Sequence, residues 1–158
     1  MKIKLNHILS AIVIMLLALC TASVYAPIRF DRIKTEREAA VKERLMAIRK
    51  AQEAYRKANG MYAGSFSALV GNRLIADSMQ FVPYSEGEKF SMTATVHTGK
   101  SGKPVPLVEC GAEYKSYLKG LDENRIEGLT EKAYERGAYP GLKFGDITTP
   151  NDNAGNWE

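Results

Sequence analysis

The stretch RLMAIRKAQEAYRKANG, residues 44–60, decides the fold of this chain of 158 residues. In it and just before it, uncharged residues recur at alternating steps of four and three, which places them on one face of a helix. These residues are Val41, Leu45, Ile48, Gln52 and Tyr55. Asn59 and Gly60 then form a pair suited to the left-handed end of a helix. The stretch therefore predicts an amphipathic helix that ends at Asn59 and packs its apolar face against other residues.

An apolar segment, residues 8–26, precedes this helix and contains no charged residue. As a helix it would be roughly 28 Å long, which is enough to cross the hydrocarbon core of a bilayer. We expect an uncleaved membrane anchor, because the segment is longer than a signal-peptide core and Pro27 would follow the cleavage point. Two alternatives stay open, namely cleavage as a signal peptide after Ala26 and attachment of lipid to Cys20.

The positive charge of the chain lies in its N-terminal part. Residues 29–57 contain ten Lys or Arg and five Asp or Glu, whereas residues 58–158 contain ten and thirteen. The net charges are therefore +5 and −3. A nucleic-acid-binding protein would need a basic face on its folded domain, so we expect no nucleic-acid partner. Basic residues directly after a membrane segment instead favour contact with anionic membrane lipid.

The orientation of the anchor is less directly indicated. Two lysines precede the apolar segment, and four basic residues follow it within residues 27–37. A count of positive charge alone would place the C-terminal part in the cytoplasm. Acidic residues share that stretch, however, and a short tail followed by a long domain suits export. We therefore expect a single-pass protein of the bacterial inner membrane with a periplasmic head.

These patterns predict an α+β fold with a long N-terminal helix packed on a small head. The expected parts are a cytoplasmic tail (1–7), a transmembrane helix (8–26), an amphipathic stalk helix (27–59) and an α+β head with an antiparallel hairpin or sheet (60–158). The head is too small to cover the whole stalk, so Phe30 and Ile33 are expected to project and to need partners. The face from Val41 to Tyr55 is expected to pack on its own head. A coiled-coil seam is the alternative, but its heptads last barely two repeats.

A hydrophobic helix here runs into an amphipathic one that ends in Ala51-Gln52-x-x-Tyr55, followed by Gly60-x-Tyr62 and a short helix with Leu69. Over residues 8–75 this arrangement resembles the N-terminal half of bacterial type IV pilins and type II secretion pseudopilins. The resemblance implies a helix that is embedded in the membrane before assembly and forms the core of a filament afterwards. The family's processing signal, a Gly before a Phe-Thr-Leu-Ile-Glu-like start, is absent, as are the paired C-terminal cysteines of many pilins.

Residues 90–110 predict a β-hairpin, because apolar and polar residues alternate up to Val96 and a turn at residues 99–102 follows. If the turn is centred between Lys100 and Ser101, Val96 lies opposite Val105, Ala94 opposite Leu107 and Cys110 opposite Ser91.

This register bears on catalysis, because Cys110 and His97 are the only candidates for a nucleophile–base pair. They would lie roughly 20 Å apart along the strand, which is too far for a Cys–His pair. We expect Cys110 at a strand end and His97 in solvent, and we expect no catalytic residue, no cofactor and no enzymatic activity.

Residues 112–136 are mostly helical in character, with Asp122 as the cap of a helix that carries Ile126, Leu129 and Ala133. Tyr139-Pro140-Gly141 predicts a type II turn, and residues 142–144 predict an edge strand.

The acidic, Asn-rich tail begins at Asp146. Asp146, Asp152 and Glu158 could ligate calcium through oxygen atoms, but a surface turn is the favoured interpretation. Trp157 is expected to pin the tail to the head. The alternative is a docking surface formed by Trp157 and Tyr139 together with Tyr134.

The sequence therefore favours a structural or assembly role through the N-terminal helix, with partners that are membrane lipid and copies of the chain or other envelope and secretion components. The alternative is an anchored or secreted module whose head binds a ligand or partner.

Overall fold

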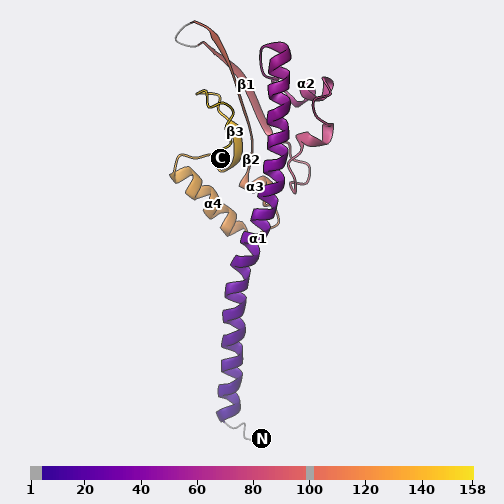
Figure 1. The fold of residues 1–158 in the computed structure, drawn as a ribbon. Helices are drawn as coiled ribbons and strands as arrows, with labels where there is room; N and C mark the ends of the chain where they lie inside the picture. Colours follow the sequence, from indigo (N-terminus) through magenta and orange to yellow (C-terminus); the bar gives the residue numbers. More distant parts are fainter. Residues whose placement is uncertain (1–4, 99–101) are drawn as a thin grey trace. The chain divides into compact units, whose positions relative to one another are not determined.

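The computed structural model describes residues 5–98 and 102–158 (Figure 1). Its internal contacts divide the chain into two units, residues 1–35 and 36–158. Helix α1 (Leu5–Asn59) contributes to both units and remains helical through Pro27. All the other helices and strands belong to the second unit.

The first unit consists of the apolar part of α1. Its large side chains are exposed, with Ile14, Met15 and Leu17 each more than 60% accessible. Within the described residues, α1 is the one helix that is long and apolar enough to cross a membrane, a test that a signal sequence near the N-terminus would also pass. Phe30 is only 7% exposed and Ile33 is half-buried, so the prediction that these two side chains project into solvent is wrong.

The second unit is built around the last turns of α1. Val41, Leu45, Ile48 and Gln52 are completely buried there, and Tyr55 is half-buried. The predicted amphipathic face thus lies inside the head, which leaves no seam for a coiled coil at these positions. The helix ends as predicted, because Gly60 has a φ of 76° and its amide donates to the carbonyl of Arg56 at 2.8 Å.

The sheet of the head is antiparallel, with β2 (Pro104–Glu113) between β1 (Ser91–Thr98) and β3 (Gly141–Gly145). Together with α1 this gives the predicted α+β layout, and β3 is the predicted edge strand. The predicted hairpin register is wrong by one residue, since Val96 pairs with Pro106 and His97 with Val105. Five residues, 99–103, separate the last pair, and an odd number shifts the register from that of a two-residue turn. The predicted turn residues 99–101 lie outside the described residues.

Two stretches of the sheet edge cannot readily pair with another strand, for local reasons. Backbone groups of alternate residues in a strand point to the same side, and the Val108 carbonyl points toward Gly145 of β3. The backbone nitrogens of Pro104 and Pro106, four and two positions earlier in β2, therefore also point to this side, where β3 has already ended. They have no N–H group to offer there. On the outer edge of β3, Asn156 donates from its backbone amide to the Lys143 carbonyl at 3.0 Å. Its side chain accepts from the Lys143 amide at 3.1 Å and donates to the Gly141 carbonyl at 2.9 Å.

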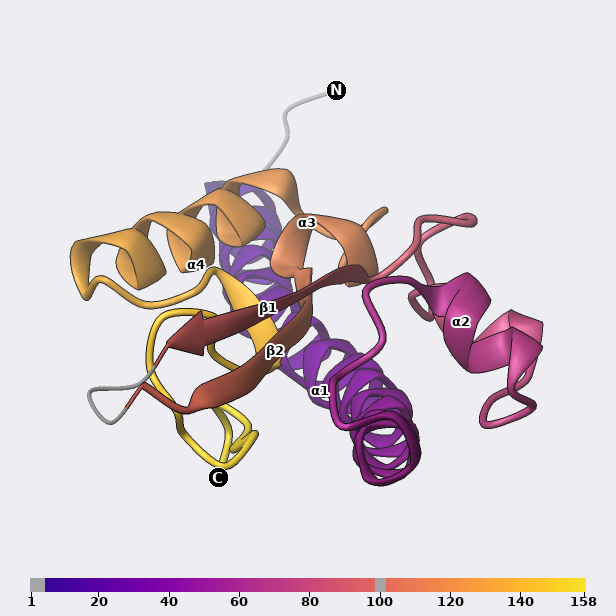
Figure 2. The ribbon, with the colours of Figure 1, turned by 90° about the horizontal axis from the view of Figure 1, so that it is seen from above.

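Shorter helices surround this frame. They are α2 (Phe66–Gly71), the 3₁₀ helix η1 (Asp77–Gln80), α3 (Tyr114–Tyr117) and α4 (Glu123–Glu135). In the second unit, α2 and α4 lie on opposite sides of α1 (Figures 1 and 2). The Asp122 side chain caps α4 as predicted by accepting from the Arg125 amide at 3.2 Å.

Two predictions for the C-terminal half are wrong. Residues 112 and 113 belong to β2 and not to a helix, because their pairing with Leu142 and Gly141 of β3 overrides local helical character. At Pro140 the chain makes a three-residue turn, with the Gly141 amide donating to the Tyr139 carbonyl at 2.9 Å, where a four-residue type II turn was expected.

Candidate functional site

The tail of the chain is fastened to α1 by a polar network. The Arg49 guanidinium donates to the Asn153 carbonyl at 3.1 Å and to the Glu158 carboxylate at 2.8 Å. The Asn153 side chain donates in turn to the Tyr62 hydroxyl at 2.7 Å, and Arg56 donates to the same hydroxyl at 2.8 Å. Two parts of the chain that are distant in the sequence, residues 49–62 and the tail, therefore meet at this point of the head.

The backbone of the tail supports this network. Asp152 and Asn153 both have a left-handed backbone conformation, with φ values of 53° and 56°. The Ala154 amide closes the turn by donating a hydrogen bond to the Asn151 carbonyl at 3.0 Å. Asp and Asn tolerate this conformation better than most residues. The hydrogen bond from Arg49, aided by one from the Gly155 amide, holds the pKa of the Glu158 carboxyl below its ordinary value.

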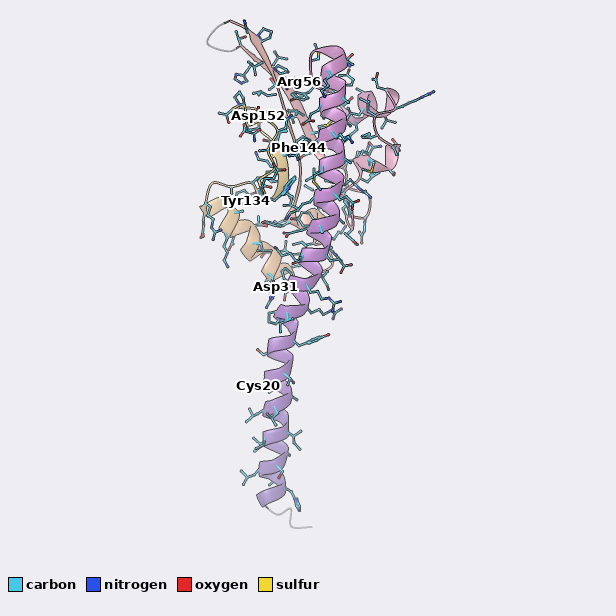
Figure 3. The ribbon with its side chains drawn as sticks, in the orientation of Figure 1. Cys20, Asp31, Arg56, Tyr134, Phe144 and Asp152 are labelled. Carbon is cyan, nitrogen blue, oxygen red and sulfur yellow. The ribbon has the colours of Figure 1, made fainter. Side chains whose placement is uncertain are left out.

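A groove of about 450 Å³ lies beside the network (Figure 3 labels Arg56 and Asp152). Its lining residues are Glu53, Arg56 and Lys57 of α1 and Asp152 and Asn153 of the tail. The lining thus offers carboxylates, cations and an amide, but no serine, cysteine or histidine that could serve as a nucleophile. Such a lining suits reversible binding of a polar segment through hydrogen bonds and ion pairs.

The possible calcium ligands are not brought together. The Asp146 carboxylate accepts from Thr148 and Thr149, and these hydrogen bonds lower its pKa. Glu158 is paired with Arg49. Within residues 5–98 and 102–158, no group of three or more His, Cys, Asp and Glu is placed to hold a metal ion.

Cys110 and His97 are separated, although the register that predicted their separation was itself one residue off. Cys110 lies opposite Met92 instead of Ser91, five positions from His97 along the strand, or about 17 Å. Cys110 is completely buried, and burial raises the pKa of its thiol, so the reactive thiolate is disfavoured. His97 is exposed.

The three aromatic residues proposed for docking differ in their surroundings. Trp157 is half-buried and its indole ring lies over Gly155, so it folds back on the tail. Tyr139 is also half-buried, and the Lys143 ammonium lies 5.6 Å from its ring centroid. Tyr134 on α4 is 63% exposed and is the most open of the three (Figure 3).

The residues expected to pack or assemble are mostly unavailable to other molecules. Val41, Leu45 and Ile48 are inside the head, and Phe30 is buried. The open apolar surface lies instead on the first unit, where Cys20 is also exposed.

Sequence reasoning missed Arg49, Tyr62, Asn153 and Asn156. The turn-forming composition of the tail indicated an ordered surface turn, but no local signal indicated which residues of α1 it would contact.

Comparisons with protein-family models, with curated proteins and with solved structures found no match to this chain.

Proposed function

We propose that this chain is a single-pass membrane protein of the bacterial cell envelope with a structural or assembly role exerted through α1. One observation carries the proposal. The apolar window of α1 is entirely unburied, and the same helix continues into the core of a folded head. A helix of this kind both holds the head at a membrane and offers a surface to neighbouring chains.

The exposed apolar side chains of α1 favour an environment less polar than water. Burying one large aliphatic side chain contributes about 1.5–3 kcal/mol of favourable free energy. In water, this contribution would be lost for many side chains of the apolar window. Those more than half exposed include Leu9, Val13, Ile14, Met15, Leu16, Leu17 and Leu19. Lipid tails or the apolar helix of another subunit would supply the less polar environment.

The arrangement on which the resemblance to type IV pilins and type II secretion pseudopilins was based supports the assembly part of the proposal. In this view the anchor lies in the inner membrane, the head faces the periplasm, and the partners are copies of the chain or other envelope and secretion components. The proposal includes no cofactor.

The membrane part is tested by alkaline carbonate extraction of membranes. The native chain is expected to stay in the pellet, and the double variant Val13→Arg/Leu16→Arg to become extractable or to be lost. Each arginine costs about 2.5–3.5 kcal/mol at the centre of a span. Met46→Arg is the control for adding an arginine elsewhere on α1, because Met46 is an exposed apolar residue of this helix outside the apolar segment 8–26. Extraction of the native chain by carbonate would exclude an anchored protein.

The assembly part is tested by oxidative cross-linking in intact membranes. Cys20 is exposed and Cys110 is buried, so contact between neighbouring apolar helices is expected to give a disulfide-linked dimer through Cys20 alone. Cys20→Ser should abolish that dimer, and Cys110→Ser should leave it unchanged. A native chain that stays monomeric under oxidant, while Cys20 still reacts with a small thiol reagent, would count against contact at this position.

A second candidate function is a membrane-anchored or secreted binding module, and the groove beside the tail favours it. Intact-mass measurement on membrane and soluble fractions separates the two. A full-length mass in the membrane supports the anchored protein, whereas a soluble form lacking residues 1–26 would make the binding module the leading candidate.

A further inference from the structure

We propose that the outer end of the apolar helix binds the headgroups of anionic phospholipids through a collar made of Tyr25, Arg29 and Arg32. The inference rests on the proposed function, because it needs α1 in a membrane. It adds to that function the residues that recognise the anionic lipid and the phosphodiester headgroup as the part that they bind.

The three side chains form one stripe on α1. With about 100° per residue, Arg29 and Arg32 lie about 40° and 20° on either side of Tyr25. Along the axis they lie about 6 Å and 10 Å beyond it. All three are exposed, and Tyr25 is 67% accessible. The stripe therefore passes from the end of the apolar segment into the layer where lipid headgroups lie.

The structure distinguishes these two arginines from Arg37, a basic residue of the same stretch. The Arg37 guanidinium is used by the head, where it donates to the carbonyls of Tyr117 and Lys119 at 3.0 and 2.9 Å and lies 5.0 Å from the ring centroid of Tyr84. In the part of the chain that the structure describes, Arg29 and Arg32 make no ion pair and no side-chain hydrogen bond.

The nearest acidic residue does not neutralise the collar. Asp31 lies about 120° around the helix from Tyr25. It directly precedes Arg32, and adjacent residues of a helix do not face each other. Glu36 lies on the same stripe, one turn beyond Arg32, but within the described residues it forms no ion pair with either arginine. Two guanidinium groups and one carboxylate leave the stripe with a net charge of +1. Labelled side chains in Figure 3 include Asp31 at this level of α1.

The chemistry fits a phosphodiester headgroup. A guanidinium donates two parallel hydrogen bonds to phosphate oxygens, and a tyrosine at the end of a span suits the boundary between hydrocarbon and headgroups. Free phosphate would satisfy the arginines but would leave Tyr25 and the 60% exposed Ile28 uncovered. A phospholipid covers both the charge and the apolar surface, so we commit to a membrane lipid.

The test uses the full chain in nanodiscs of equimolar phosphatidylglycerol and phosphatidylcholine, with the retained lipids counted by native mass spectrometry. The native chain is expected to retain phosphatidylglycerol preferentially. Arg29→Gln/Arg32→Gln should lower that preference by about fivefold per arginine, since each basic residue near an anionic surface contributes about 1 kcal/mol. Arg73→Gln/Arg136→Gln is the matched control, because both residues are exposed arginines of the head and the change in charge is the same.

Flotation with vesicles of pure phosphatidylcholine separates this inference from the proposed function. All three proteins should float with these vesicles, because the apolar window alone drives insertion. Flotation together with an unchanged lipid preference in Arg29→Gln/Arg32→Gln would overturn the collar and leave the anchor intact. Failure of the native chain to float would overturn the anchor, and the collar with it. Added inorganic phosphate that competes away the bound lipid at constant ionic strength would show that the site takes free phosphate.

Discussion

Replacing Gln52 by leucine is expected to lower the free energy of unfolding by about 3–5 kcal/mol, because each orphaned buried backbone group costs about 1–3 kcal/mol. Gln52 is completely buried, and its side-chain amide forms two hydrogen bonds with the backbone of one residue on the loop after α1. The Nε2 atom donates to the Ala63 carbonyl at 2.9 Å, and the Oε1 atom accepts from the Ala63 amide at 2.9 Å. Ala63 is only 1% exposed, so water cannot replace either partner.

The measurement is urea unfolding of the full chain in detergent, followed by the fluorescence of Trp157, the single tryptophan. Glu53→Leu is the control, because residue 53 is exposed and its replacement should change stability by no more than about 0.5 kcal/mol. If Gln52→Leu unfolds at the same urea concentration as the native chain, the loop after α1 is not held in this way.

Gly145→Ala is expected to destabilise the head by more than about 2 kcal/mol, because it combines backbone strain with a collision. Gly145 has a φ of 74°, a conformation that favours glycine. A methyl group at this position would also collide with the carbonyl oxygen of Val108 on the neighbouring strand. The Val108 carbonyl and the Gly145 Cα atom both belong to the backbone of paired strands, so the collision cannot be relieved by the rotation of a flexible side chain.

Gly137→Ala isolates the backbone strain. Gly137 also has a positive φ, 63°, but no atom lies within 4 Å of an added methyl group. Strain alone should cost it about 1 kcal/mol. Comparison of the two variants by the same urea titration therefore gives the cost of the collision. Equal destabilisation of both variants would contradict the close approach of β2 and β3.

The parts of the fold that depend on local signals could be predicted from the sequence. The spacing from Val41 to Gln52 identified the buried face of α1, Gly60 its end, and Asp122 the start of α4. Each of these predictions uses residues within a few turns of one helix, where periodicity and capping chemistry decide the outcome.

The wrong predictions concern features that depend on contacts between segments distant in the sequence. The hairpin register depended on an odd-length connection that alternation of residue types cannot reveal, and Ala112 was assigned to a helix because its pairing with Leu142 is not a local property. The tail shows the same limit. Its residues predicted a turn, but the contact between Arg49 and Asn153 joins positions 104 residues apart.

The closed stretches of the sheet edge have a consequence for the tendency of this head to aggregate. An open strand edge is a template on which a strand from any neighbour can add, and growth of that kind ends in aggregation. Asn156 occupies the outer edge of β3 with its own backbone and side chain, and Pro104 and Pro106 deny donors along the unpaired part of β2. These three residues block strand addition along the outer edge of β3 and along the unpaired part of β2, so two heads that met at these edges would not join their sheets there.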